Sequence, residues 1–277
     1  MMWNHNQLSP TFSPLRDDFL VRVQTDWFAK SHPVVTNQQL IPRLDEWFQS
    51  TRVNNLTGWH SFPCVDVTMG CTHYIESLVI RLGWEGFQIL NHEYAYYSFN
   101  GKWGVNAGDL EPNKPLLITI PHYTWAGVRP EWDDVLRECE QKNIDIHIDM
   151  AWITLAKNVN IDFSHPCIQS VGMSISKYSM QWNRVGLRYS RQRTMDSITM
   201  FNHYYQPGTN SSQSSCAACA IETIPRDYGW NTYGVHHQDI CNTLDLNATD
   251  LVHVIKDKDN KPWGITEMLM TVVPESK

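Results

Sequence analysis

The stretch Ile168-Gln-Ser-Val-Gly-Met-Ser-Ile-Ser-Lys177-Tyr-Ser179 carries the sequence feature that decides the fold. Its first half is mostly apolar, which is typical of a buried strand. Lys177 follows this run and lies between residues with hydroxyl side chains. A lysine amine becomes a nucleophile only when burial or a neighbouring cation lowers its pKa. Taken alone, the stretch is better explained by a surface lysine at a strand end. Other segments of the chain must therefore show whether Lys177 belongs to a reactive site.

Short β-rich runs alternate with helical segments on both sides of this stretch. Strands that alternate with helices predict an α/β domain with a mostly parallel sheet and flanking helices. The expected strands are residues 64–68, 87–91, 116–120, 144–148, 168–174 and 184–189. The expected helices are residues 37–49, 72–82 and 130–142.

Three regions are expected along the chain. Residues 1–60 are predicted to be an N-terminal arm that forms part of a small domain, residues 61–223 the large domain, and residues 224–277 a reduced small domain. Composition predicts a loop at 206–215, followed by a helix of small residues. The last region is expected to be irregular and to form a small antiparallel or α+β cap, with a turn at 256–261 between the β-like runs 250–255 and 263–273.

Composition excludes several classes of protein. The net charge of −7, without a run of Lys and Arg, argues against nucleic-acid binding. No stretch approaches the apolar length of a membrane span, and the first residues lack the pattern of a signal peptide. The seven scattered cysteines predict free thiols in a reducing compartment, hence a cytoplasmic protein.

Further segments carry weak chemical signals. In Thr68-Met-Gly70-Cys71-Thr72 a strand ends, a glycine turns the chain and small residues open a helix, whose free N–H groups can cradle a phosphate. An ordinary strand–helix turn with a threonine cap explains the same residues. Arg184, followed by Val-Gly-Leu-Arg, can pair with a phosphate through two N–H groups, or it can be a solvated surface residue.

Asp149 ends an apolar strand in Ile-His-Ile-Asp-Met-Ala-Trp152. Ligands of open α/β sheets bind at such strand ends, and a carboxylate there can pair with a protonated ring nitrogen. A helix cap after the strand is an equally good explanation for this aspartate alone.

The order and spacing of these segments resemble the class I/II aminotransferase family of fold-type-I pyridoxal phosphate (PLP) enzymes, over about residues 65–223. Asp-Met-Ala-Trp is similar to the family's Asp-x-Ala-Tyr, and Ser-Ile-Ser-Lys to its Ser-x-Ser-Lys. Ile-Pro-His-Tyr-Thr-Trp-Ala-Gly stands where the family has Asn-Pro-His-Asn-Pro-Thr-Gly, and Asn-His-Glu-Tyr94 where it has Pro-x-Tyr. The resemblance implies a PLP-dependent transferase-like large domain, with PLP as the cofactor, and a homodimer.

The resemblance also implies a role for each matching residue. Lys177 would form the Schiff base with PLP and move protons, and Asp149 would hold the pyridine nitrogen. Tyr94 would stack on the ring, and Trp152 stands where a tyrosine usually donates to the phenolic oxygen. The phosphate would be cradled by Gly70, Cys71, Thr72, Ser174, Ser176 and Arg184.

Some positions depart from the family. The asparagine that bonds the phenolic oxygen is missing, and Tyr123 or Thr124 stands nearest to its place. Arg184 comes one residue earlier than usual. The arginine near the C-terminus that grips the substrate carboxylate is also missing, since Arg226 is the last arginine. Candidate substitutes are Arg226, Arg52 or a residue of a partner subunit.

The leading hypothesis is therefore a PLP-dependent, aminotransferase-like enzyme of specialised biosynthesis that acts on an amine or amino acid. A PLP-dependent lyase, decarboxylase or cyclase on the same fold stays open, as does a scaffold protein that has lost catalysis. The nucleotide-binding glycine motifs are absent, which disfavours a generic nucleotide-binding protein. No metal site is expected, because Cys216-Ala-Ala-Cys219 and His236-His237 are better explained by packing.

Overall fold

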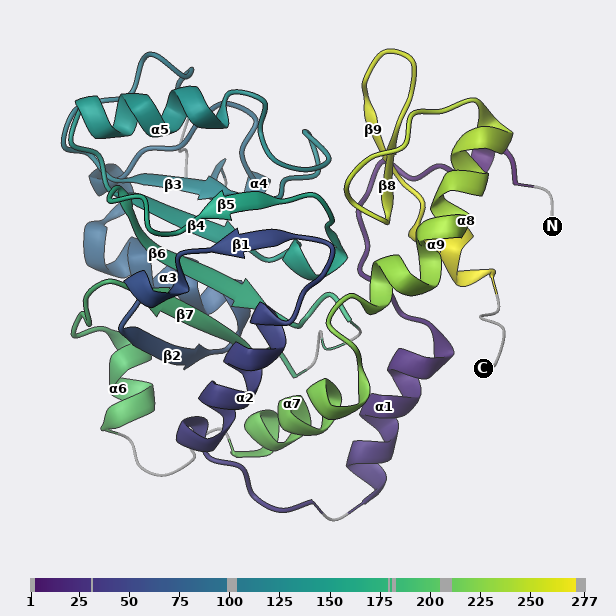
Figure 1. Ribbon diagram of the computed structural model, residues 1–277, viewed down its shortest axis with the longest axis horizontal. Coiled ribbons are helices and arrows are strands. Elements are labelled where there is room, and N and C mark those ends of the chain that lie inside the picture. Colours follow the sequence, from purple (N-terminus) through teal and green to yellow (C-terminus); the bar gives the residue numbers. More distant parts are fainter. Residues whose placement is uncertain are drawn as a thin grey trace.

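The computed structural model describes residues 3–30, 32–98, 104–178, 180, 183–204 and 211–272. Its centre is a five-stranded sheet in the order β2-β7-β6-β4-β3 (Figure 1). Within it, β3, β4 and β6 pair in parallel, while β7 is antiparallel to both β6 and β2. Four strands thus point the same way and one opposes them, which confirms the predicted α/β class with a mostly parallel sheet. The strands are β2 (Cys64–Thr68), β3 (Leu116–Thr119), β4 (Ile146–Met150), β6 (Ile168–Ser174) and β7 (Gly186–Ser190).

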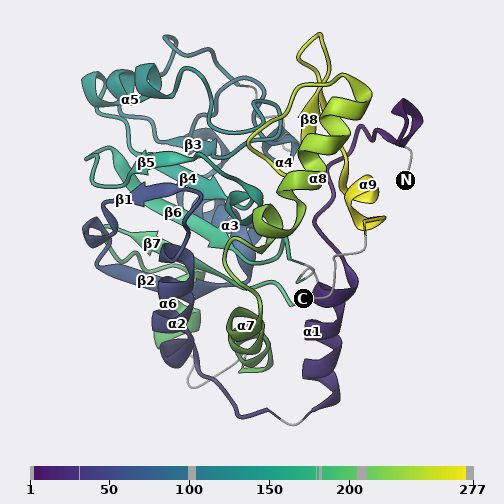
Figure 2. The ribbon, with the colours of Figure 1, turned by 45° about the vertical axis from the view of Figure 1, so that its right-hand side comes forward.

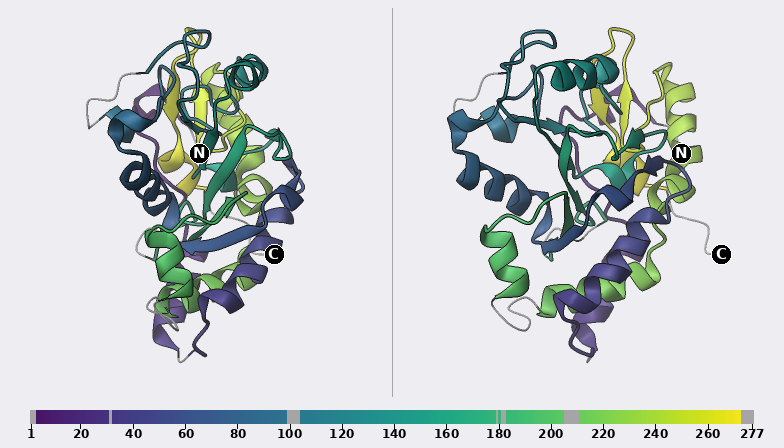
Figure 3. Two further views of the ribbon diagram at one scale, coloured as in Figure 1. Left: turned by 90° about the vertical axis from the view of Figure 1, so that its left-hand side faces the viewer. Right: turned by 60° about the vertical axis from the view of Figure 1, so that its left-hand side comes forward.

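Helices cover both faces of this sheet. Figure 3 shows α3 (Gly70–Leu82) on one side and α2 (Asn37–Gln49) on the other. Both helices are amphipathic, so each buries its apolar stripe against the strands. The other helices are α1 (Asp18–Ala29), α4 (Ala95–Ser98), α5 (Trp132–Gln141), α6 (Ser197–His203), α7 (Ser211–Thr223), α8 (Tyr228–Leu244) and α9 (Thr266–Met270). None of the described helices is long and apolar enough to cross a bilayer.

The C-terminal elements lie beside the carboxyl ends of the central strands. Figure 2 shows α8, β8 (Val254–Lys256) and α9 next to the N-terminal segment. A bridge between Ser9 and Gly264 ties the two ends of the chain together there. Two smaller sheets complete the fold, a parallel pair of β1 (Asn55–Thr57) with β5 (Asn160–Asp162) and an antiparallel pair of β8 with β9 (Pro262–Gly264). The three-region division stays a prediction.

Three predicted strands need correction, and one of them, expected at 184–189, begins at Gly186 and ends at Ser190. Residues 87–91 form no strand, because only Gln88 and Leu90 make single bridges, to Leu116 and Val105. The strand expected at 144–148 begins at Ile146 instead. Asn143 takes a positive φ of 54°, and the Ile144 N–H donates back to the end of α5, so the chain is still turning there.

The C-terminal region contains a long helix where its sequence predicts irregular structure. Residues expected to be irregular form α8, and α9 occupies the middle of the second β-like run. Helix α8 contains glycines and β-branched residues with weak helix propensity, so packing of its buried face stabilises it instead. The loop predicted at 206–215 is wrong from Ser211 onward, where α7 begins, and residues 206–210 lie outside the described part.

Gly172 in β6 fixes how closely α3 approaches the sheet. A Cβ at this position would lie 2.3 Å from Cδ1 of Tyr74, a wholly buried side chain of α3. The Tyr74 hydroxyl is 2.8 Å from Ser170 Oγ on the same strand. A larger residue at Gly172 would therefore push away the helix whose first turn borders the cavity described below.

We expect Gly172→Ala to lower the free energy of unfolding by about 1–3 kcal/mol, because the added methyl overpacks the Tyr74 ring. Urea unfolding measures the loss. Gly86→Ala is the matched control, since its Cβ meets only Leu82 at 3.4 Å, and we expect it to change stability by less than about 0.5 kcal/mol. Equal midpoints for Gly172→Ala and the unmodified protein would contradict the close approach.

Candidate functional site

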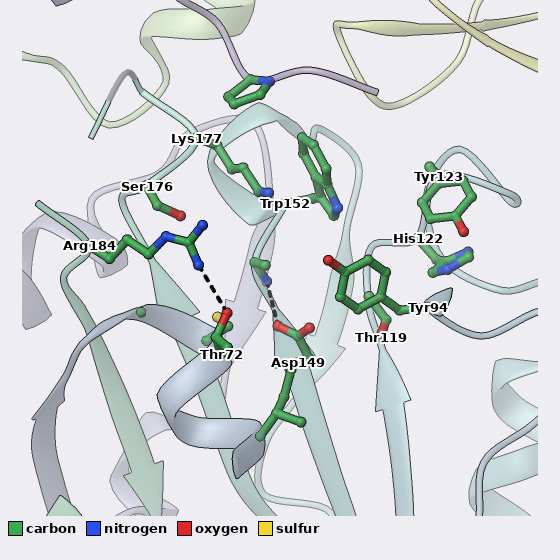
Figure 4. A pocket seen from close by; sticks show the side chains of 15 residues that line it. Thr72, Tyr94, Thr119, His122, Tyr123, Asp149, Trp152, Ser176, Lys177 and Arg184 are labelled. Carbon is green, nitrogen blue, oxygen red and sulfur yellow. Dashed lines mark hydrogen bonds between the residues drawn. The ribbon is translucent and has the colours of Figure 1, made fainter. Parts of the chain in front are cut away.

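A cavity of about 220 Å³ opens at the carboxyl ends of β3, β4 and β6, facing the start of α3 (Figure 4). Parallel strands end at one edge of a sheet, which is where open α/β sheets bind ligands. All the predicted site residues except Ser174 and Thr124 line it. Its lining is Pro14, Gly70, Cys71, Thr72, Ile75, Tyr94, Thr119, His122, Tyr123, Asp149, Ala151, Trp152, Ser176, Lys177 and Arg184.

Lys177 lies past the end of β6 and is partly buried. Its Nζ is 3.7 Å from the centre of the Trp152 ring, a distance at which an ammonium is attracted to the aromatic face. Burial lowers the pKa of this amine, and the opposite charge of Asp149 works against that effect. The site therefore stabilises the unprotonated form of this amine relative to an amine in water. The unprotonated amine is the form that attacks a carbonyl.

Asp149 is buried at the end of β4, and the Ala151 N–H donates to its Oδ1 at 3.0 Å. Burial raises the pKa of this carboxyl, whereas Cys71, the Ala151 N–H and Lys177 favour the charged form. The Cys71 thiol lies against the Gly172 carbonyl, at 3.4 Å. Burial and then the Asp149 charge raise the pKa of that thiol well above its usual value, so Cys71 stays protonated and acts as a donor rather than a nucleophile.

The first turn of α3 forms an anion cradle with the residues opposite it. Gly70 takes a φ of +74°, and a Cβ there would lie 3.3 Å from Ser174 Oγ and 3.4 Å from Arg184 Cβ. Arg184 Nη1 donates to Thr72 Oγ1 at 3.2 Å. Free N–H groups at a helix start, together with hydroxyls and a guanidinium, match the needs of a phosphate dianion.

Ser174 supports the cradle from behind instead of lining it. Its Oγ accepts the Ser176 N–H at 3.1 Å and donates to Ser176 Oγ at 2.9 Å. Ser174 therefore orients Ser176, which does face the cavity.

Aromatic rings form the side of the cavity opposite Arg184 (Figure 4). Tyr123 lies between two other rings, Phe12 at 4.6 Å and His122 at 4.2 Å. Buried His122 accepts the Thr124 N–H on Nδ1 at 3.2 Å, so Thr124 anchors the histidine and does not reach the cavity. Of the two residues nearest the missing asparagine, Tyr123 is the one that lines the site.

Sequence reasoning missed five contributors to the lining, Pro14, Ile75, Thr119, His122 and Ala151. Thr119 could have been found, because it lies near the end of a predicted parallel strand, paired with Asp149. Pro14 gives no local signal, since its segment reaches the site through contacts with distant residues, such as the backbone bond from the Leu15 N–H to the Lys177 carbonyl and the stack of Phe12 on Tyr123.

The suggested substitutes for a carboxylate-binding arginine lie elsewhere. Arg226 and Arg52 line a separate cavity of about 400 Å³. Arg226 is buried with its guanidinium 5.3 Å from the Trp47 ring and donates to the Ile153 carbonyl. Within the described chain, Lys177 and Arg184 are the cationic side chains that line the first cavity.

Cysteine and histidine positions that could suggest a metal are used for packing. Cys216 is buried in α7, and His237 in α8 bonds the Val252 carbonyl at 2.9 Å. Among the residues that the structure describes, no group of three or more suitable side chains could hold an ion.

No family model and no curated protein sequence matches this chain. Solved structures do match it. The chain is similar to an aromatic amino acid aminotransferase from Burkholderia cenocepacia J2315, with 12% identity and a TM-score of 0.59 over 86% of this chain and 76% of the other. It is similar to a PLP-bound C-S lyase from Staphylococcus hominis, with 10% identity and a TM-score of 0.61 over 97% and 89%.

A third similar structure is an alanine aminotransferase from Pyrococcus furiosus, with 14% identity and a TM-score of 0.58 over 88% of this chain and 72% of the other. At such low identities the likeness shows the fold. The chain has the fold of PLP-dependent aminotransferases and C-S lyases, which confirms the fold that the sequence predicts.

We expect this protein to lose stability as the pH falls from 7.5 to 5. Burial lowers the pKa of His122, His147 and His253 to about 3 and that of His237 to about 4. In the unfolded chain they titrate near 6.5, so below that pH the unfolded state binds more protons and the free energy of unfolding falls. Glu93, whose pKa burial raises to about 7, and Asp149, whose pKa burial also raises, act in the opposite direction, whereas His73, whose pKa burial lowers, adds a fifth histidine to the four.

Urea unfolding between pH 7.5 and 5 measures this loss, with a limiting slope of about 1.4 kcal/mol per pH unit for each histidine. His147→Gln should reduce this slope by the contribution of about one proton. The exposed control His60→Gln should leave the slope unchanged. A free energy of unfolding that is constant over this range would show that these histidines are not held neutral.

Proposed function

We propose that this protein is a PLP-dependent enzyme that acts on an amine or amino acid, in an aminotransferase-like role in specialised biosynthesis. The observation that carries the proposal is that Lys177 and Asp149 face one cavity whose third side is the cradle at the start of α3. When bound, PLP supplies an aldehyde for amine capture and a pyridinium ring that stabilises negative charge on the substrate's α carbon.

The residues present fit this cofactor. Gly70 and Thr72, with Ser176 and Arg184, would hold the phosphate, because together they offer backbone N–H groups, hydroxyls and a guanidinium. Asp149 would hold the ring nitrogen in its protonated form, since a buried carboxylate next to a nitrogen base favours the charged pair. Tyr94 and Trp152 would bound the ring with their aromatic faces.

Lys177 is the residue that would capture the cofactor and move protons. Its lowered pKa makes the free amine more accessible than it is for a lysine in water, and an amine of this kind can accept and return a proton. Trp152 cannot share this task, because an indole N–H only donates. Cys71 cannot either, because its raised pKa keeps the thiol protonated.

The fold does not choose among the reactions of PLP enzymes, since aminotransferases and a C-S lyase share it. Lyase, decarboxylase or cyclase chemistry therefore stays the alternative to transamination. A scaffold without catalysis is disfavoured, because it would need neither the amine of Lys177 nor the buried carboxylate of Asp149. The homodimer and the cytoplasmic location stay predictions from the resemblance and from the cysteine pattern.

Added PLP should attach covalently to Lys177. We expect a visible absorption band that borohydride removes, with a matching mass increase on the peptide that contains Lys177. Lys177→Arg should lose both signals because it keeps a charge but has no amine to react. Lys157→Arg is the matched control, since Lys157 also lies over an indole, 4.0 Å from the Trp230 ring. A colourless protein with no mass increase would overturn the proposal, whereas loss of the band on adding amines in a screen would identify substrates.

Removal of the guanidinium should weaken PLP binding without abolishing the attachment. We expect Arg184→Ala to raise the dissociation constant about 10- to 100-fold, the size of one charge-assisted contact. Quenching of tryptophan fluorescence measures the affinity. The control is Arg137→Ala, an exposed arginine paired with Asp134 on α5. An unchanged dissociation constant for Arg184→Ala would remove this arginine from the phosphate site.

A further inference from the structure

His253 lies directly behind the cavity wall, although it does not line the cavity. Its ring is wholly buried and stacks on Trp152, with 4.5 Å between ring centres and 18° between planes. Lys177 Nζ is 3.7 Å from the centre of the same indole. An amine and a stacked ring cannot share one face at these distances, so Trp152 is held between Lys177 on one face and His253 on the other.

The imidazole makes no other polar contact within the described chain. Neither of its ring nitrogens has a hydrogen-bond partner there. Burying a polar ring without hydrogen bonds costs free energy, so an apolar side chain would fill this place more favourably if filling space were its only task. Within the described chain, the stack on Trp152 is the contact that gives this ring a defined orientation.

We propose that His253 is a positioning residue that holds the Trp152 indole against Lys177 and thereby keeps the amine desolvated. The inference rests on the proposed role of Lys177 as the reactive amine. It also assigns the C-terminal segment a part in the site, because His253 immediately precedes β8. Its backbone is fixed from the far side by the Ile265 N–H, which donates to the His253 carbonyl at 2.9 Å.

The charges around the stack agree with this role. Burial, followed by the charges of Lys177 across the indole and of His237, lowers the pKa of the His253 ring to about 3. The imidazole is therefore neutral at physiological pH and does not repel the amine across the indole. On its own side, Lys177 faces Asp149, Cys71 and Arg184, of which the first two favour the charged amine and the third disfavours it.

Loss of the ring behind Trp152 should let the indole move away from the amine and let water reach it. The pKa of Lys177 should then rise toward the ordinary lysine value, because burial is the main cause that lowers it. His253→Phe should keep the wild-type pKa, since a phenyl ring stacks in the same place. His253→Leu should raise the pKa as His253→Ala does, because leucine fills the volume without a flat face.

The experiment is an NMR titration of the full-length chain, freed of bound aldehydes by dialysis against hydroxylamine and carrying ¹³C-dimethylated lysines. Lys177→Arg identifies the Lys177 signal. We expect that signal to titrate below those of the other lysines in the wild type and in His253→Phe. We expect an upward shift in His253→Ala and His253→Leu, with His60→Ala as the surface control.

Two results would overturn the inference: an unshifted Lys177 signal in folded His253→Leu, or a shift in His253→Phe equal to that of the leucine variant. The leucine variant decides if His253→Ala does not fold. Because no PLP is present in this titration, its outcome is separate from the proposed function, which fails instead if the unmodified chain does not attach PLP.

Discussion

Two ionisable side chains, the acid Asp149 and the amine Lys177, face one cavity, and the rest of the site follows from the cost of burying them there. Burial disfavours the charged form of each, raising the pKa of the acid and lowering that of the amine, while each favours the charge on the other. An unsupported buried charge would be prohibitive. The chain therefore provides a backbone donor from Ala151 to the carboxylate and an aromatic face from Trp152 to the amine.

The direction of the strands explains why these groups meet. β3, β4 and β6 run in parallel, so Thr119, Asp149 and the segment that leads to Lys177 leave the sheet at one edge. The start of α3 faces this edge, and its position depends on the close packing of Tyr74 on Gly172. The cavity therefore has an electropositive side at the helix start and an uncharged aromatic side opposite it, and an asymmetric ligand with one anionic group can enter in only one favourable orientation.

The sequence predicted those parts of the site that depend on local position. Asp149 and Lys177 follow apolar strand runs, and a residue at the end of such a strand lies at the sheet edge whatever the other elements do. Contacts between distant segments left no such signal. The stack of Phe12 on Tyr123 joins two segments whose sequences give no hint of each other, and the stack of Trp152 on His253 joins two more. Helix α8 escaped prediction for a related reason, since its stability comes from packing and not from helix propensity.

The tryptophan at position 152 has a consequence for proton transfer. A tyrosine in its place could donate and accept a proton, whereas an indole can only donate. The raised pKa of Cys71 keeps that thiol protonated, and Asp149 is committed to its donors. In the proposed PLP enzyme, proton transfer would therefore fall to the Lys177 amine, whose lowered pKa brings it closer to the range where it can both accept and release a proton. Under the proposed role of His253, Trp152 would contribute by excluding water from that amine, so the position of an apolar ring would tune how reactive the lysine is.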